Sequence, residues 1–121
     1  MAQSYLQQLL RGVVEPLLLL LISELPTYGY QIMKELEKRS QGYFRLRGST
    51  IYSALRRLER EGLVLSSWDQ VARRQGRRCY KLTEKGGQIL SQKLAEWQGF
   101  YRAATRVMNN NSLVSDLEAG E

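Results

Sequence analysis

The segment from Gly48 to Val64 constrains the fold most, because it joins a two-sided helical pattern to an abrupt stop. At the 3.6-residue period of a helix, Ile51, Leu55 and Leu58 fall on one face, with Ala54 at its edge. The pattern predicts an amphipathic helix over residues 49–61. Gly62 would end this helix, and the apolar residues after it predict a strand.

The opposite face of this predicted helix is polar and basic. Hydroxyl groups lie toward its N-terminal half and guanidinium groups toward its C-terminal half: Ser49, Ser53, Arg56 and Arg60, flanked by Thr50 and Arg57. Short donors can reach base edges, and arginines can hold phosphates or guanine, so the face is suited to a nucleic acid. For this helix alone, a solvated basic face without a ligand is an equally good interpretation.

The distribution of charge favours the first interpretation. The chain of 121 residues has a net charge of +6 and a length suited to one domain with its own core. From Arg45 to Lys85 there are 11 Lys/Arg against 4 Asp/Glu, which leaves 7 of the 18 basic and 8 of the 12 acidic residues elsewhere. The positive charge therefore lies in the central third and indicates a polyanionic partner.

Several classes of site lack the residues they need. The chain has no histidine and one cysteine, Cys79, which excludes intrachain disulfides, Cys/His zinc sites and His-dependent triads. We therefore expect that the protein is not an enzyme and that it binds no cofactor and no metal. The longest apolar run, Leu17 to Ile22, is far shorter than the ~20 residues of a membrane span. The N-terminus lacks the charged start of a signal peptide, so we expect a cytoplasmic protein without a membrane partner.

Two helices are expected before the central one. A leucine-rich helical period covers residues 4–24, and we expect its main helix to begin near Val13 with Pro16 in the first turn. Because residues 17–22 are apolar all round, this helix needs cover on several sides, which suggests a subunit interface. The next helix is expected over residues 28–39, with Thr27 as its N-cap.

A hairpin is expected after Gly62. Residues 63–68 are rich in strand formers, and residues 77–83 alternate between apolar and polar side chains with the period of two of a half-buried strand. A polar loop joins the two strands and forms a wing beside the basic helix. Its tip holds Arg73, Arg74, Arg77 and Arg78, which we expect to contact phosphates.

The last helix is expected over residues 84–108, with Thr83 as its N-cap. Its apolar residues recur in alternating steps of four and three: Leu90, Leu94, Trp97, Tyr101, Ala104 and Met108. Such a stripe is either core packing or a helix–helix seam between subunits, and we favour the seam. Leu17 and Leu21 of the first helix would share the interface. Residues 109–121 are polar and acidic, and we expect them to be disordered.

Three motifs in this order resemble the PadR-like transcriptional regulators. They are the segment Tyr28-Gly-Tyr-Gln-Ile32, the segment from Thr50 to Val64, and the segment from Gly76 to Gly86. The resemblance implies a mainly α fold with a small β-hairpin, in which residues 1–83 form a winged helix-turn-helix and residues 84–108 a dimerisation helix. It also implies a homodimeric repressor that binds double-stranded DNA, with the helix over residues 49–61 in the major groove and the wing along the DNA backbone.

Two further expectations concern ligands. We expect Tyr30, Tyr52 and Lys81 to contact DNA together with the residues named above. The resemblance implies release by a small aromatic or hydrophobic effector, for which Trp97 is the candidate contact, although packing is the plainer role for this residue. Cys79, flanked by basic residues, is either a redox-sensitive thiol or a small strand residue.

An alternative function comes from a different class. The chain could be a winged-helix adaptor that binds proteins and has lost DNA binding. Eleven cations within 41 residues, from Arg45 to Lys85, would repel one another without a polyanion, which favours the DNA-binding interpretation. Salt-dependent retention on DNA would separate the two.

Overall fold

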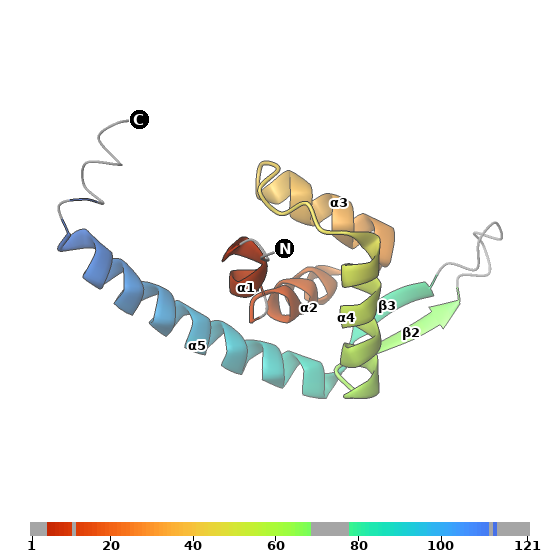
Figure 1. Cartoon of the computed structure of the whole chain (residues 1–121). Helices are drawn as coiled ribbons and strands as arrows, with labels where there is room; N and C mark the ends of the chain where they lie inside the picture. The colour runs from red at the N-terminus through yellow and green to blue at the C-terminus, as the bar shows by residue number, and fades with distance from the viewer. Residues whose placement is uncertain (1–4, 11, 69–77, 112, 114–121) are drawn as a thin grey trace. The chain divides into compact units, whose positions relative to one another are not determined.

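A computed structural model describes residues 5–10, 12–68, 78–111 and 113 (Figure 1). Its elements, in chain order, are α1 (Tyr5–Leu10), α2 (Val14–Glu24), β1 (Thr27–Tyr28), α3 (Gly29–Arg39), α4 (Gly48–Arg60), β2 (Val64–Trp68), β3 (Arg78–Leu82) and α5 (Glu84–Asn109). The predicted class, mainly helical with a small antiparallel sheet and a long last helix, is confirmed. The chain forms two compact units, residues 1–90 and residues 91–121.

The core of the first unit lies where α2, α3, α4 and the sheet meet. Helix α2 contacts α3, α4 and β3, and α4 also contacts α3 and β2. The largest fully buried side chains come from all of these parts: Leu18, Leu19, Ile22, Ile32, Ile51, Leu55, Leu58 and Val64. Burying one such side chain contributes roughly 1.5–3 kcal/mol. The apolar face predicted for α4 is therefore the face that anchors it.

Helix α4 ends in the way that the sequence predicts. Its bounds lie one residue earlier than expected at each end, and Gly62 follows with a φ of +78°, a conformation that favours glycine. The N–H of Gly62 donates to the carbonyl of Glu59 at 3.0 Å, and the N–H of Leu63 donates to the carbonyl of Leu58 at 2.9 Å. This pair of bonds is a Schellman motif, which satisfies the last carbonyls and turns the chain directly into β2.

The start of α3 corrects one prediction. Thr27 is not the N-cap: with Tyr28 it forms the short strand β1, and α3 begins at Gly29. The Thr27 hydroxyl donates to Gln31 Oε1 at 2.9 Å, and the N–H of Tyr28 donates to the same oxygen at 3.4 Å. Gln31 thus reaches back to the helix start, as the last residue of a capping box does.

The sheet has three antiparallel strands in the order β1-β3-β2, rather than the two of the predicted hairpin. Thr27 lies opposite Tyr80, and Trp68 lies opposite Arg78. Because side chains alternate across a strand, Arg78 and Tyr80 share one face of β3, and Lys81 lies on the other face with Cys79. Tyr80 is buried, and so is Val64, which lies opposite Leu82 on the same face of the sheet, so this face packs against the helices.

Helix α5 begins with the predicted cap. The Thr83 hydroxyl accepts from the N–H of Gly86 at 2.9 Å and donates to the carbonyl of Gly62 at 2.7 Å. Gly86 and Leu90 are buried, and the first compact unit includes this start of α5 up to Leu90. The helix ends at Asn109, and most of the predicted acidic tail lies outside the described residues.

Candidate nucleic-acid interface

The outer face of α4 gathers the polar residues that the sequence assigned to it. With the apolar face fully buried, the opposite side chains are directed to solvent: Ser49, Thr50, Tyr52, Arg56 and Arg60 are exposed, and Ser53 is half-buried. Within the described residues, no ion pair involves Arg56 or Arg60. Their positive charges are therefore uncompensated and available to a phosphate or to a guanine edge.

Arg57 has a different environment from its neighbours. Its Nε lies 3.0 Å from Glu15 Oε2 of α2, and its Nη1 donates to the Ser53 hydroxyl at 3.5 Å. The side chain remains 46% exposed, so the pair is screened by solvent. Arg57 links α4 to α2, and part of its charge is neutralised before any ligand arrives.

Two exposed tyrosines flank the junction of α3 and α4. Tyr30 lies in the first turn of α3, and the Lys34 ammonium lies 5.1 Å from the centroid of its ring. Tyr52 comes from α4, and its ring lies against Gly29 at the start of α3. Both rings are exposed planar surfaces on which sugars or bases can pack.

The base of the wing is held by a polar cluster that sequence reasoning missed. The Arg78 Nη1 donates to the Ser66 hydroxyl at 2.8 Å, and that hydroxyl donates to Glu59 Oε2 of α4 at 2.7 Å. The guanidinium carbon of Arg78 also lies 4.6 Å from the ring centroid of Trp68. Only the register of β2 against β3 reveals this cluster, because no spacing in the sequence links the residues.

Other predicted wing residues lie elsewhere. Lys81 is exposed on the sheet face opposite Arg78, so the two cations point to different sides of the wing. Arg73, Arg74 and Arg77 lie outside the described residues. Cys79 is half-buried on the same face as Lys81, and neither of its two interpretations is tested by this position.

Tyr80 shows how this cluster affects a neighbouring titratable group. Burial is the main cause that raises the pKa of the Tyr80 hydroxyl, and the Glu59 carboxylate adds to it. Arg78 and Arg56 act in the opposite direction and lower that pKa. The pKa of Tyr80 is therefore raised above its ordinary value of 10.0, and the hydroxyl carries no charge at physiological pH.

This geometry agrees with one family of known proteins. Residues 18–92 match the model of the family described as "Transcriptional regulator PadR-like family". The chain belongs to this PadR-like family. Its members are transcriptional regulators rather than enzymes, and the fold is the winged helix.

Individual relatives agree with the assignment to the PadR-like family. An uncharacterized protein of Lysinibacillus sphaericus is 30% identical over 89 residues, which are 74% of this chain and 82% of that protein. The solved structure of a transcriptional regulator from Clostridium thermocellum is 27% identical with a TM-score of 0.76, covering 88% of this chain and 97% of that one. The crystal structure of a PadR family transcriptional regulator from Eggerthella lenta is 30% identical, also with a TM-score of 0.76, and the match covers 89% of this chain and 92% of that one.

The second unit of this PadR-like chain presents an apolar helix face. In the part of α5 after Leu90, Leu94 and Ala104 are half-buried, whereas Trp97, Tyr101 and Met108 are exposed. The rings of Trp97 and Tyr101 stack with centroids 5.9 Å apart and planes 27° apart. Phe100 and Val107, which the predicted stripe omitted, are 69% and 73% exposed and widen the apolar surface.

The remaining interface candidates lie in the first unit. Leu21 and Leu90 are buried within its core, so each has little surface left for another subunit. Leu17 is half-buried on α2. Leu17 therefore keeps accessible apolar surface that a second chain could cover.

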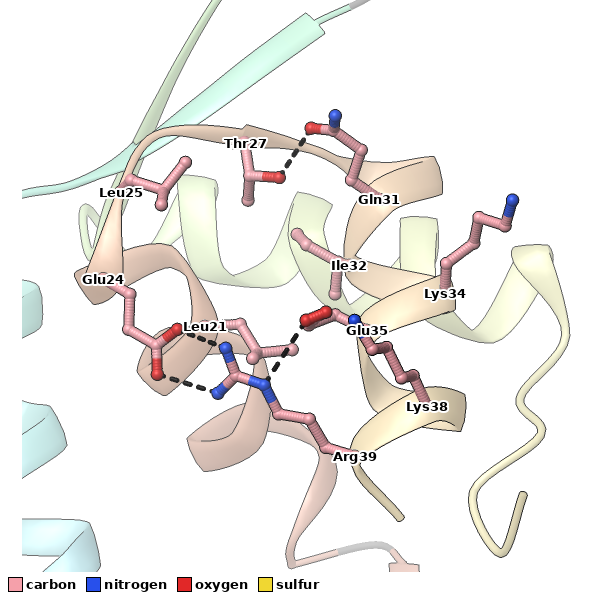
Figure 2. A pocket seen from close by; sticks show the side chains of 10 residues that line it. All are labelled: Leu21, Glu24, Leu25, Thr27, Gln31, Ile32, Lys34, Glu35, Lys38 and Arg39. Carbon is pink, nitrogen blue, oxygen red and sulfur yellow. Dashed lines mark hydrogen bonds and ion pairs between the residues drawn. The ribbon is translucent and has the colours of Figure 1, made fainter. Parts of the chain in front are cut away.

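An open pocket of about 350 Å³ lies between the end of α2 and α3 (Figure 2). Leu21, Leu25 and Ile32 supply its apolar lining. At one end, Arg39 donates to both carboxylate oxygens of Glu24, at 2.6 and 2.8 Å, and the Arg39 Nε lies 3.5 Å from Glu35. Glu35 and Arg39 form an i,i+4 pair on α3, and the shorter bonds from Arg39 to Glu24 hold α2 to α3.

Metal-binding clusters and membrane-spanning helices are both absent from the part of the chain that the structure describes. Within the described ranges, no three His, Cys, Asp or Glu residues come together as metal ligands would. In the same part of the chain, no helix combines the length and the apolar character needed to cross a bilayer.

Proposed function

We propose that this PadR-like regulator binds double-stranded DNA with α4 as its recognition helix. The observation that carries the proposal is the outer face of α4, where Arg56 and Arg60 are exposed and form no ion pair with any carboxylate that the structure describes, while the inner face is fully buried. A rigidly anchored helix with one polar, cationic face is the element that fits the major groove.

The residues of this face divide into two groups. Ser49, Thr50 and Ser53 lie in the N-terminal half, where a recognition helix contacts base edges. Arg56 and Arg60 lie one and two turns further along and can reach either guanine or the phosphates. Arg78 at the base of the wing would neutralise a backbone phosphate, and we propose the same role for Arg73, Arg74 and Arg77 of the loop sequence.

We further propose that the DNA-binding form is a homodimer. One winged domain covers one half-site, and a two-fold dimer reads two half-sites about one helical turn, ~34–36 Å, apart. The apolar surface of α5, from Leu94 to Met108, supports this proposal, because large exposed aromatic surface is costly in a monomer. Leu17 of α2 would contribute to the same interface.

Repression with release by an effector completes the proposal. A dimer bound across two half-sites would occlude the DNA that it covers. A small planar hydrophobic molecule could pack against Trp97, which is 42% exposed and already stacked on Tyr101. Binding at the dimer seam would then shift the spacing of the two recognition helices.

Selection of bound duplexes from random DNA tests the central claim. We expect an enriched two-fold symmetric motif, and log K for that duplex should fall linearly with log salt. The Arg56→Ala and Arg60→Ala variants should bind it more weakly, whereas Lys38→Ala, which removes the same charge beside the α2–α3 pocket, should not. A wild-type protein without salt-dependent retention on any duplex would favour the adaptor function instead.

A further inference from the structure

Glu59 is an acidic residue in the most basic part of the molecule. It lies on α4 between Arg56 and Arg60, and a carboxylate there would repel the phosphates that the arginines attract. The carboxylate is half-buried and accepts the Ser66 hydroxyl of β2 at 2.7 Å. Glu59 is therefore directed toward the sheet, where it has a partner other than DNA.

Ser66 links Glu59 to Arg78 in a short relay of hydrogen bonds. The Ser66 hydroxyl accepts from Arg78 Nη1 at 2.8 Å and donates to the Glu59 carboxylate, so it joins a guanidinium to a carboxylate. Hydrogen bonds in such a chain polarise and strengthen one another. The ring of Trp68, the cross-strand neighbour of Arg78, adds a further contact at 4.6 Å. The Arg78 guanidinium is thus held directly by the Ser66 hydroxyl and the Trp68 ring, both from β2, and indirectly, through Ser66, by Glu59 of α4.

We propose that Glu59 and Ser66 are positioning residues for Arg78. They hold its guanidinium at the base of the wing, so that it reaches a DNA phosphate already oriented and keeps the wing in register with α4. The proposal rests on the DNA binding proposed above. It assigns Glu59 a role that offsets its repulsion of phosphate, because the carboxylate orders a cation that contacts DNA.

The binding test compares Ser66→Ala with Ser67→Ala in the full chain, on the duplex that wild type selects. Ser67 is the next residue of β2 and lies on the opposite sheet face, across from Cys79, so its loss should leave the affinity unchanged. Ser66→Ala should weaken binding about 3–10-fold, because Arg78 must then be ordered on binding. The slope of log K against log salt should stay at its wild-type value, since the guanidinium still reaches the phosphate.

The Arg78→Ala variant shows whether Ser66 acts by positioning Arg78 or by a general effect on the fold. This variant should reduce the magnitude of the salt slope by about one, as expected for one lost phosphate contact. In the Arg78→Ala background, Ser66→Ala should cause no further loss of affinity. An equal loss with and without Arg78, or identical affinities for Ser66→Ala and Ser67→Ala, would overturn the proposal.

A second readout needs no DNA. In a Trp97→Phe background, Trp68 is the single tryptophan, and its emission reports the guanidinium beside its ring. Ser66→Ala and Glu59→Ala should each change this emission in the direction of Arg78→Ala, while Glu59→Gln, which keeps an oxygen acceptor, should change it less. Unchanged emission in both alanine variants would contradict the relay. If these variants changed the emission as expected but the wild-type protein bound no duplex, the relay would hold and the proposed DNA binding would fail.

Discussion

The ring of Tyr52 on α4 covers Gly29 at the start of α3. A Cβ placed on Gly29 would lie 2.5 Å from Tyr52 Cε1 and 2.9 Å from the Tyr52 hydroxyl oxygen. Gly29 is buried, whereas Tyr52 keeps 40% of its surface exposed on the outer side. The absence of a side chain at residue 29 therefore fixes where a candidate DNA-contacting ring lies.

We expect Gly29→Ala to lower the free energy of unfolding by about 1 kcal/mol, because the added methyl group overlaps the exposed Tyr52 ring and displaces it from its contact with α3. The ring is a side chain at the surface, so it can move aside only by leaving its position over α3. In a Tyr52→Ala background the same substitution should cost clearly less. Urea unfolding of the four proteins measures both values, and an equal cost in the two backgrounds would show that the ring is not the obstacle.

Arg56 and Arg57 are adjacent but should respond differently to alanine. Arg56→Ala should weaken binding to the selected duplex by about 1–3 kcal/mol if the side chain reads a base. Arg57→Ala should weaken it less, because its guanidinium is paired with Glu15 at 3.0 Å. Glu15→Gln should release Arg57 and tighten binding at low salt. Titrations of the three variants at two salt concentrations decide this, and a larger loss for Arg57→Ala would make Arg57 the base reader.

The pair of Glu24 and Arg39 should make stability depend on acid pH. The hydrogen bonds from Arg39 are the main cause that lowers the pKa of Glu24, and burial opposes them. Because the folded pKa lies below the unfolded value of about 4.3, the stabilisation is complete above that pH and is lost as the pH falls through the folded pKa. Glu24→Gln should therefore unfold at a lower temperature than wild type at pH 7, with a smaller difference at pH 3. A difference that does not change with pH would contradict this assignment.

The strongly periodic parts of the chain could be predicted from the sequence. The buried face of α4, the stop at Gly62 and the cap at Thr83 each follow from local spacing and local backbone chemistry. Strand β1 could not be predicted, because two residues give no alternation and its partner β3 lies far along the chain. Thr27 was therefore interpreted as a cap.

The candidate site shows the same division between local and long-range information. The outer face of α4 follows from helical spacing, so its members could be predicted together. The bonds from Arg57 to Glu15 and from Arg78 through Ser66 to Glu59 depend on tertiary packing and strand register. From the sequence alone these arginines cannot be distinguished as DNA contacts. In the structure, Arg57 and Arg78 have partners within the chain.

Leu94 is the second of the six residues in the apolar stripe on α5, and its side chain is half-buried. Replacing it by Asp would place a carboxylate within the proposed seam, at a cost of several kcal/mol unless the helices separate. We expect Leu94→Asp to remain helical by circular dichroism, to sediment as a monomer, and to lose affinity for a two-half-site duplex.

Ala95→Asp is the matched control for the dimer seam. Ala95 is exposed one residue further along α5, on the side of the helix that carries Arg102 and Arg106, away from the stripe. The same carboxylate there should leave both the sedimentation coefficient and the DNA affinity unchanged. If Leu94→Asp stayed dimeric with full affinity, the stripe would not be the seam, and the exposed Phe100 and Val107 beside it would need another explanation. If both variants became monomers, added negative charge on α5, rather than burial of Leu94, would be the cause.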